Sequence, residues 1–198
     1  ENGSVVSINT PYMNRLGSVG KPLPHLKVEI IGDEICIFGD HNSGYLNEVG
    51  ITDDCLRTGD LGHLDDDGYL YVTGRKKNLI ITSYGRNISP EWIESELVLS
   101  PSIAQCLVYG DAKPFCSAII IPRTAMVKHS EINNAINELN KTLPDYAEIK
   151  SWFFADEPFK VSNGLLTANG RPKRLDIAFR YQNEIKDIYE TKFVSGVS

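Results

Sequence analysis

Short apolar runs alternate with turn residues in the first part of the chain. The runs lie at residues 28–31, 34–38 and 69–72, and they are separated by Gly32-Asp33, Asn42-Ser43-Gly44 and Asp67-Gly68. Short strands that are interrupted by Gly and Asp turns are typical of antiparallel sheet. Residues 1–73 therefore predict an antiparallel sheet or a partial barrel, with no helix of useful length.

Strands and helices are mixed after residue 78. Apolar runs at 103–109, 118–121 and 149–154 predict three strands, and Gly110-Asp111 predicts a hairpin turn between the first two. Three strands with covering helices make a small α+β domain. The junction between the two parts falls within residues 75–78, and we place it between residues 76 and 77.

Three helices are predicted in this second part. Ser89 can cap the first helix, and Pro90 suits its first turn. Apolar residues at helical spacing predict a second helix over 130–143, which Pro144 ends. A final helix is predicted from about Leu175 to Tyr189, after a polar, glycine-rich loop.

The composition narrows the class of protein. With 198 residues, 41% of them hydrophobic, the chain can form a packed core as one domain or two small ones. The net charge of −6 argues against general attraction to nucleic acid or membrane surfaces. No apolar run approaches the roughly 20 residues that span a bilayer. The four cysteines are scattered without a C-x-x-C pair, which favours reduced thiols in the cytoplasm. The chain starts Glu-Asn-Gly without a methionine or signal peptide, as if cut from a longer protein.

The candidate chemistry is densest between residues 58 and 94. Thr58-Gly59-Asp60 forms a predicted turn, and the carboxylate of Asp60 could accept hydrogen bonds from two vicinal ribose hydroxyls. The alternative is a turn aspartate that bonds its own backbone. Arg75, in Gly74-Arg75-Lys76-Lys77, has a fork of donors that suits hydroxyls and phosphate oxygens; the alternative is a solvated basic turn.

These motifs, in this order and spacing, resemble the nucleotide-binding and hinge region of the adenylate-forming (AMP-binding) superfamily. The glycine loop Ser83-Tyr84-Gly85-Arg86-Asn87 and the helix start Ser89-Pro90-Glu91 follow the basic cluster, and the stretches 17–24 and 44–47 also fit. The resemblance implies an α+β protein in two parts. Residues 1–76 would be the antiparallel, β-barrel-like end of a large AMP-binding domain. Residues 77–198 would be the mobile C-terminal lid domain, a three-stranded sheet with helices.

The resemblance also implies roles for single residues. Asp60 and Arg75 would bind the nucleotide, and Lys77 would be the hinge about which the lid domain turns between two half-reactions. The loop of Ser83, Tyr84, Gly85 and Arg86 would receive CoA, with Gly85 letting the pantetheine chain pass close to the backbone. A plain hairpin turn is the alternative for that loop.

The loop 163–174 resembles the last motif of the family, a Thr-x-x-Gly-Lys pattern with a basic residue three positions on. Thr167, Gly170 and Arg174 match, but Arg171 stands where the catalytic lysine is expected. Arginine keeps the charge but is larger and planar, so it does not simply replace a lysine. Arg171 and the neighbouring Lys173 are therefore the candidate catalytic residues.

The implied activity is that of an ATP-dependent acyl-CoA synthetase, closest to the long-chain fatty acid–CoA ligases. Its substrates would be ATP, a carboxylic acid and coenzyme A, with Mg²⁺ ligands outside this chain, and its partner would be the rest of its own large domain, without which the chain would be inactive. Peripheral membrane association is open. The alternatives are transfer to a carrier protein or an amine, and a non-catalytic module that keeps the fold, which Arg171 favours.

No metal site is predicted in the chain itself. Asp65-Asp66-Asp67-Gly68 resembles a calcium loop, but His63 stands at its first ligand position and Gly74 at its last. A hairpin turn is the better interpretation. The histidines at 25, 41, 63 and 129 have no metal-ligand spacing.

Overall fold

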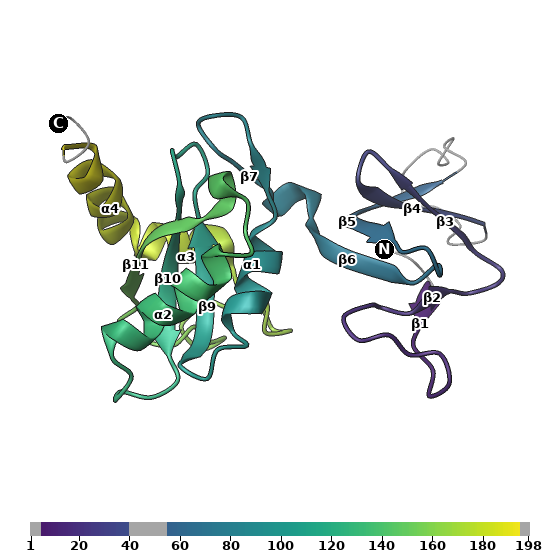
Figure 1. Ribbon diagram of the computed structural model, residues 1–198, viewed down its shortest axis with the longest axis horizontal. Coiled ribbons are helices and arrows are strands. Elements are labelled where there is room, and N and C mark those ends of the chain that lie inside the picture. The colour runs from purple at the N-terminus through teal and green to yellow at the C-terminus, as the bar shows by residue number, and fades with distance from the viewer. Residues whose placement is uncertain (1–4, 40–54, 195–198) are drawn as a thin grey trace. The chain divides into compact units, whose positions relative to one another are not determined.

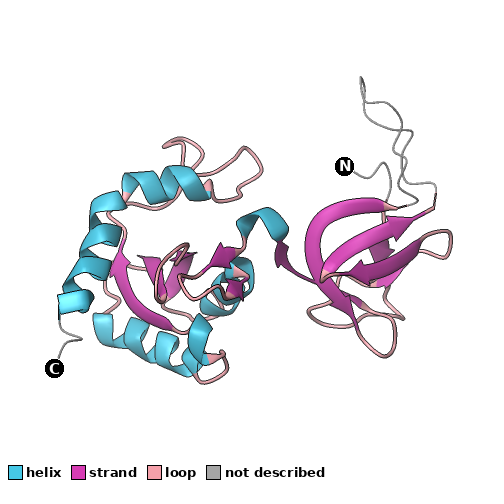
Figure 2. Cartoon of the chain, turned by 90° about the horizontal axis from the view of Figure 1, so that it is seen from above, coloured by secondary structure: helices cyan, strands magenta, loops and turns pink. Residues whose placement is uncertain are grey.

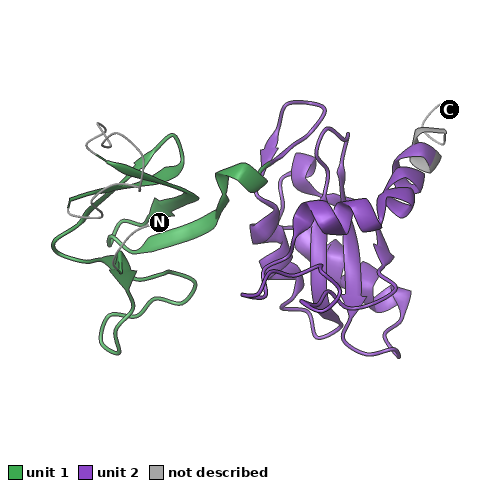
Figure 3. Cartoon of the chain, turned by 180° about the vertical axis from the view of Figure 1, so that it is seen from behind, with its two compact units in different colours: residues 1–79 green, residues 80–198 purple. Residues whose placement is uncertain are grey.

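The computed structural model describes residues 5–39 and 55–194, with side chains to residue 190. The chain divides into two compact units, Glu1–Leu79 and Ile80–Ser198 (Figure 3). The division falls after Leu79, whereas the sequence predicts a junction after Lys76. The turn expected at 42–44, the motif at 44–47 and His41 lie outside the described residues.

The first unit contains a four-stranded antiparallel sheet (Figure 1). Its order is β3 (Lys27–Ile31), β4 (Glu34–Phe38), β5 (Leu56–Leu64) and β6 (Leu70–Arg75). A second, two-stranded sheet pairs β1 (Ser7–Ile8) with β2 (Lys21–Pro22), and the short 3₁₀ helix η1 (Lys76–Asn78) follows β6. The predicted antiparallel pairing is confirmed.

The barrel-like closure that the sequence predicts is wrong for the described residues. In that part of the chain β3 and β6 are the two edges of an open sheet and do not pair with each other. The alternation of short apolar runs specifies which strands pair. Closure depends in addition on strand number, tilt and stagger, which the hydrophobic pattern does not carry.

The β3–β4 hairpin follows from its two turn residues. Gly32 and Asp33 both have positive φ, 60° and 66°, as a two-residue type I′ hairpin requires. The turn leads directly into β4, a central strand whose Ile35, Cys36 and Ile37 are all buried. Glu34, the first residue of β4, is therefore the first buried residue after an exposed turn.

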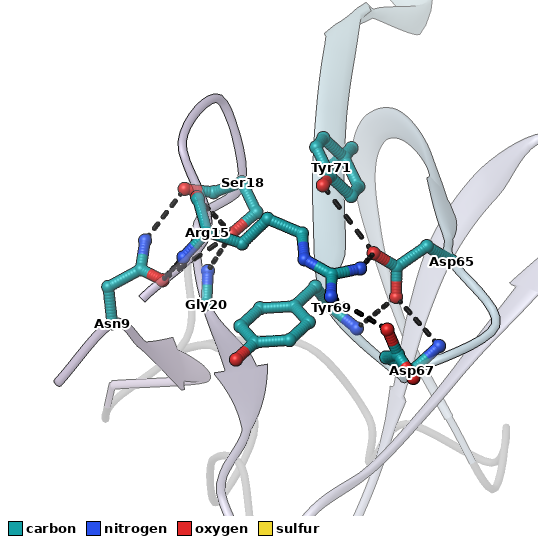
Figure 4. Close-up of polar contacts among 8 residues, drawn as sticks. All are labelled: Asn9, Arg15, Ser18, Gly20, Asp65, Asp67, Tyr69 and Tyr71. Carbon is teal, nitrogen blue, oxygen red and sulfur yellow. Dashed lines mark hydrogen bonds and ion pairs between the residues drawn. The ribbon is translucent and has the colours of Figure 1, made fainter. Parts of the chain in front are cut away.

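Arg15 ties the loop between β1 and β2 to the β5–β6 turn (Figure 4). Its guanidinium lies 2.5 Å from a carboxylate oxygen of Asp65, 2.7 Å from one of Asp67, and 4.5 Å from the centre of the Tyr69 ring. Asp65 also accepts the backbone N–H groups of Asp67 and Tyr69. The predicted hairpin turn is confirmed, with Gly68 at φ 79°.

The second unit is a three-stranded sheet between two layers of helices (Figure 2). Its order is β11 (Ile149–Phe154), β10 (Cys116–Pro122), β9 (Ile103–Tyr109); β9 and β10 are antiparallel, and β10 and β11 are parallel. The three predicted strands and the α+β class are confirmed. The unit also has the two-stranded hairpin β7 (Ile80–Ile81) and β8 (Asn87–Ile88) and the 3₁₀ turn η2 (Asp145–Ala147).

Alternate residues of the sheet face two separate cores. Helices α1 (Pro90–Leu97) and α2 (His129–Asn140) pack with Val108, Ala118 and Ile120 on one face. Helices α3 (Arg174–Arg180) and α4 (Gln182–Val194) pack against the other face, with Leu107 and Ile119. Burial on both faces explains why β10 is apolar except at Ser117.

One sequence expectation for this unit is wrong, and the connection of one correctly predicted hairpin is longer than expected. The final helix is broken at Tyr181, which has φ −102° and ψ 26°, whereas the sequence predicts one helix. Buried residues at four-residue spacing continue through the break, namely Ile177, Tyr181, Ile185 and Tyr189, so the periodicity hides it. The β9–β10 connection spans residues 110–115, longer than the predicted Gly110-Asp111 turn. Among the described residues, no helix has the length and apolarity needed to span a membrane.

Candidate functional site

Thr58-Gly59-Asp60 is a bulge within β5 and not the tight turn that the sequence predicts. Cys36 pairs with Arg57 and Glu34 pairs with Leu61, so the three residues 58–60 lie opposite the single residue Ile35. The Thr58 hydroxyl donates to the Ile35 carbonyl at 2.8 Å and accepts the N–H of Asp60 at 3.0 Å. Bulges of this kind redirect side chains and are common beside functional sites.

Asp60 and Arg75 are direct cross-strand partners at the end of this bulge. The Arg75 Nε atom lies 2.6 Å from Oδ1 of Asp60, and the side chains are 40% and 29% exposed. The structure therefore brings the two predicted nucleotide-binding residues together on a solvent-accessible edge. A carboxylate and a guanidinium side by side can accept from and donate to the same bound sugar. Their nucleotide role stays a prediction.

Glu34 contacts the chain neighbours of this pair, Gly59 and Lys76, and sequence reasoning missed it. Its side chain is 5% exposed, and its carboxylate accepts from Lys76 Nζ at 2.9 Å, from Arg57 Nη1 at 3.3 Å and from the Gly59 N–H at 3.1 Å. The hydrogen bond from Lys76 is the main reason that the pKa of Glu34 is lowered. A glutamate that opens an otherwise apolar strand is the signal that could have found it.

The predicted hinge residue, Lys77, lies in the 3₁₀ helix η1 that follows β6. Its neighbour Lys76 is held by Glu34, whereas Lys77 is exposed and its side chain has no partner among the described residues. Arg75 and Lys76 are thus each fixed by an acidic side chain, and Lys77 is the first residue of the segment without a side-chain partner in the described part of the chain. The hinge role itself stays a prediction.

The predicted CoA loop is a tight turn between β7 and β8. The N–H of Thr82 donates to the Arg86 carbonyl at 3.0 Å, and the N–H of Arg86 donates to the Thr82 hydroxyl at 3.2 Å. Gly85 has φ 74°, and the space in which a Cβ would stand is open. The N–H of Ser83 donates to the Lys113 carbonyl, which ties the loop to the β9–β10 connection.

A hollow of about 320 Å³ opens beside this loop. It is lined by Thr82, Tyr84, Arg86, Pro114, Asp145 and Tyr146. The Arg86 guanidinium lies over the Tyr146 ring, 5.4 Å from its centre, and Tyr84 is 75% exposed. Tyr146 comes from the distant turn η2, so sequence reasoning missed it. An arginine with two aromatic rings is a surface that suits bases and phosphates.

Arg171 is presented by a second tight turn. The N–H of Thr167 donates to the Arg171 carbonyl at 2.8 Å, and the N–H of Arg171 donates to the Thr167 hydroxyl at 3.1 Å. Arg171 is exposed, and its guanidinium has no partner within the described part of the chain. Lys173 is also exposed, with Nζ 3.7 Å from a carboxylate oxygen of Asp176. The structure leaves Arg171 free to meet an anion, while Asp176 lies near Lys173.

Arg174 anchors this turn to the sheet. Its Nη1 lies 2.8 Å from the carboxylate of Glu94 on α1, and its Nη2 donates to the Val108 carbonyl of β9 at 2.6 Å. Glu94 also accepts the Val108 N–H at 2.7 Å. Burial raises the pKa of Glu94 to about 7, although both partners favour the charged form. Sequence reasoning matched Arg174 to the motif but missed its buried partner.

The sequence of the second unit matches the family described as AMP-binding enzyme C-terminal domain, over residues 77–192. The chain belongs to the AMP-binding enzyme family. Residues 77–192 of this family member are its C-terminal domain, and the resemblance inferred from the motifs is confirmed. The division into units places residues 77–79 of that match at the end of the first unit.

Two relatives of this family member are long-chain-fatty-acid–CoA ligases. Long-chain-fatty-acid–CoA ligase FadD15 of Mycobacterium tuberculosis is 33% identical over 205 residues, which cover 88% of this chain and 34% of the relative. Long-chain-fatty-acid–CoA ligase 5 of Mus musculus is 31% identical over 228 residues, covering 93% of this chain and 33% of the relative. The chain thus spans about one third of the length of the curated relatives it matches.

The chain is also similar to solved structures of an acid–CoA ligase. O-succinylbenzoate CoA synthetase (MenE) of Bacillus subtilis, in complex with ATP and magnesium ion, is 30% identical with a TM-score of 0.65, covering 81% of this chain and 37% of that one. The same enzyme with its acyl-adenylate intermediate has a TM-score of 0.71 at 28% identity, covering 88% of this chain and 38% of that one.

Proposed function

We propose that the chain is the C-terminal part of an ATP-dependent acyl-CoA synthetase that acts on a fatty acid. The observation that carries the proposal is the paired Asp60 and Arg75, 2.6 Å apart at the solvent-accessible end of the β5 bulge, with Arg75 two positions before Lys77. A two-step ligase needs nucleotide-binding residues close to the residue about which its C-terminal domain turns, and Asp60, Arg75 and Lys77 have this arrangement. Without the rest of its large domain, the chain is inactive.

The first step joins the acid to AMP. A carboxylate oxygen of the acid attacks the α-phosphorus of ATP, a new acyl–oxygen–phosphorus linkage forms, and the bond to the β-phosphate breaks so that pyrophosphate leaves. Asp60 accepts hydrogen bonds from the ribose hydroxyls, and Arg75 donates to the nucleotide. Arg171 brings its charge to the oxygens of the α-phosphate and the acid, where negative charge gathers.

The second step transfers the acyl group to CoA. The CoA sulfur attacks the acyl carbon, the carbon–sulfur bond forms, and AMP leaves with the electrons of the broken carbon–oxygen bond, while the thiol proton goes to solvent. Rotation about Lys77 replaces the 167–171 turn at the reacting atoms by the 82–86 turn. Arg86, with Tyr146 beneath it, then contacts the nucleotide portion of CoA.

Mg²⁺ would neutralise phosphate charge in the first step. Within the described residues there is no group of three His, Cys, Asp or Glu side chains that could hold a metal ion. We therefore assign the described residues no role in binding the ion.

The fatty acid is suggested by relatives such as FadD15, whose name gives a long-chain fatty acid as its substrate. CoA is favoured over a carrier protein or an amine by Arg86 and by the two tyrosines that line the hollow beside it, although Asp145 also lines the hollow. A cytoplasmic location is proposed from the four unpaired cysteines, of which Cys36, Cys106 and Cys116 are buried. Peripheral membrane association stays a prediction.

Pyrophosphate exchange by the intact protein with a series of fatty acids tests this function. We expect ATP–pyrophosphate exchange that depends on the acid, followed by CoA thioester formation. ATP binding without exchange for any acid would instead favour a non-catalytic module, the alternative that Arg171 in the lysine position supports. Exchange without thioester formation would point to a different acyl acceptor.

A further inference from the structure

Glu34 is a buried charge in a place where only bound partners make burial tolerable. Three polar or charged residues are buried in the described part of the chain, namely Glu34, Thr82 and Ser117, and of these Glu34 alone is charged. An unpaired carboxylate in such a position costs several kcal/mol. Three donors meet it here, at 2.9, 3.1 and 3.3 Å. Glu34 therefore remains charged at low cost only while these donors stay in place.

Two of the donors to Glu34, Gly59 and Lys76, are chain neighbours of the proposed nucleotide-binding residues. Gly59 directly precedes Asp60, and Lys76 directly follows Arg75. One carboxylate therefore ties the backbone on one side of the nucleotide pair to the side chain on the other. Gly59 has φ 72°, so its N–H turns toward Glu34 in a conformation that is specific to the bulge.

We infer that Glu34 is a positioning residue for the Asp60–Arg75 pair, and that it fixes Lys76 so that rotation of the lid begins at Lys77. The inference rests on the proposed nucleotide role of Asp60 and Arg75. Through the Gly59 N–H, Glu34 holds the bulge so that Asp60 faces outward. Through Lys76, it holds the end of β6 so that Arg75 stays opposite Asp60.

The substitution Glu34→Gln in the intact protein tests the inference. Glutamine has the same shape, but one of its ends is a donor, so it cannot accept from Gly59 and Lys76 together. We expect the KM for ATP to rise about tenfold, as a small misplacement of binding groups produces, with the KM for the fatty acid unchanged. The control is Glu29→Gln, which removes a 2.6 Å ion pair with Lys27 from strand β3 of the same sheet and should leave both values as in the wild type.

A double-mutant cycle separates positioning from general destabilisation. If Glu34 acts through Asp60, then Glu34→Gln adds no further rise in the KM for ATP in an Asp60→Ala background. Lys76→Gln is the second variant, since Lys76 is 59% exposed and its substitution is safe for folding. It should reproduce part of the rise. Additive effects of Glu34→Gln and Asp60→Ala, or an unchanged KM for ATP in Glu34→Gln, would overturn the inference.

Hydrogen exchange measured by mass spectrometry tests the positioning role of Glu34 independently of the proposed function. In Glu34→Gln, peptides that cover residues 57–61 and 74–79 should exchange at least about tenfold faster, with no change in Glu29→Gln. If no acid supports adenylation but hydrogen exchange in these segments is faster in Glu34→Gln, the proposed function is wrong and the positioning role is supported. Unchanged exchange in both segments would overturn the positioning role, whatever the activity.

Discussion

Two turns of the second unit share one sequence pattern and one set of hydrogen bonds. The 82–86 turn is Thr-Ser-Tyr-Gly-Arg, and the 167–171 turn is Thr-Ala-Asn-Gly-Arg. In each, the threonine N–H donates to the arginine carbonyl, the arginine N–H donates to the threonine hydroxyl, and the glycine N–H donates to the threonine carbonyl. The glycines have φ 74° and 76°. Threonine and glycine therefore set this conformation within five residues.

The surroundings of the two arginines differ. Arg86 lies over the Tyr146 ring in a hollow, whereas Arg171 is exposed with no side-chain partner in the described chain. The first turn is tied by the Ser83 N–H to a neighbouring loop, and the second is anchored by the half-buried Arg174, which pairs with Glu94. Local sequence thus decides how an arginine is presented, and distant segments decide what it meets. In the proposed mechanism the two arginines serve different half-reactions.

Substitution of the exposed arginine should give the largest effect. Arg171→Ala is expected to slow acyl-AMP formation about a hundredfold or more, the loss typical of one group that stabilises developing charge. Thioester formation from supplied acyl-AMP should be spared, because the proposed mechanism assigns that step to the 82–86 turn. Rapid-quench assays of each half-reaction measure this. Arg171→Lys is the matched control and should retain adenylation. Equal loss in both half-reactions would mean that the turns do not divide the work.

The buried anchor of the 167–171 turn should show in the pH dependence of stability. The pKa of Glu94 is about 7 in the folded protein, above its value of 4.5 in the unfolded chain. The folded state therefore binds the extra proton between these values, and this stabilisation is lost as the pH rises through 7. We expect the stability of the wild type, relative to Glu94→Gln, to be lower at pH 8 than at pH 5 by about 1–3 kcal/mol. Urea unfolding at both pH values measures it, and an equal difference at the two would contradict the assignment.

Substitution of the arginine in the hollow should have a smaller effect on the other half-reaction. Arg86→Ala is expected to raise the KM for CoA about tenfold, as the loss of one contact to a charged group does, and to leave pyrophosphate exchange unchanged. Tyr146→Ala should cause part of the same rise, because it removes the ring on which Arg86 rests. A change in the adenylation rate of Arg86→Ala would contradict the proposal that the two turns serve different half-reactions.

Substitution of the two turn glycines, Gly85 and Gly170, should have the smallest effects, and the loss of stability should be similar for both. Gly85→Ala and Gly170→Ala each place a Cβ at positive φ with open space around it, so only the backbone cost of about 1 kcal/mol applies. Thermal unfolding measures each variant. Costs that differ by more than about twofold would show that the two turns are less alike than their hydrogen bonds suggest.

Much of the fold could be predicted because its determinants are local. The three strands of the second unit follow from apolar runs, and the hairpin at Asp65–Gly68 follows from its turn residues. The Thr58-Gly59-Asp60 bulge could not be distinguished from a turn, because the same residues favour both and the choice depends on the partner strand. The break at Tyr181 was hidden since buried residues keep their spacing across it.

The candidate site divides in the same way. Asp60, Arg75, Arg86 and Arg171 could be proposed from motif order alone, although their roles stay predictions. Glu94 and Tyr146 could not, because each acts through a contact with a residue far away in the sequence. Glu34 has a local signal, a glutamate at the start of an apolar strand, but its partner Lys76 is also distant in the sequence. Glu94 pairs with Arg174, eighty positions on. No pattern in a single sequence connects such residues.

The bulge in β5 also constrains how this segment can change in length. Three residues oppose one, so the strand carries two extra residues, an even number that preserves the alternation of side chains between the two faces. Leu56 and Leu64 consequently both reach the hydrophobic cores of the first unit. Deleting one residue from 58–60 would shift the phase and turn Leu64 to the opposite face. Removing two would keep the phase, so a shorter deletion should be more harmful here than a longer one.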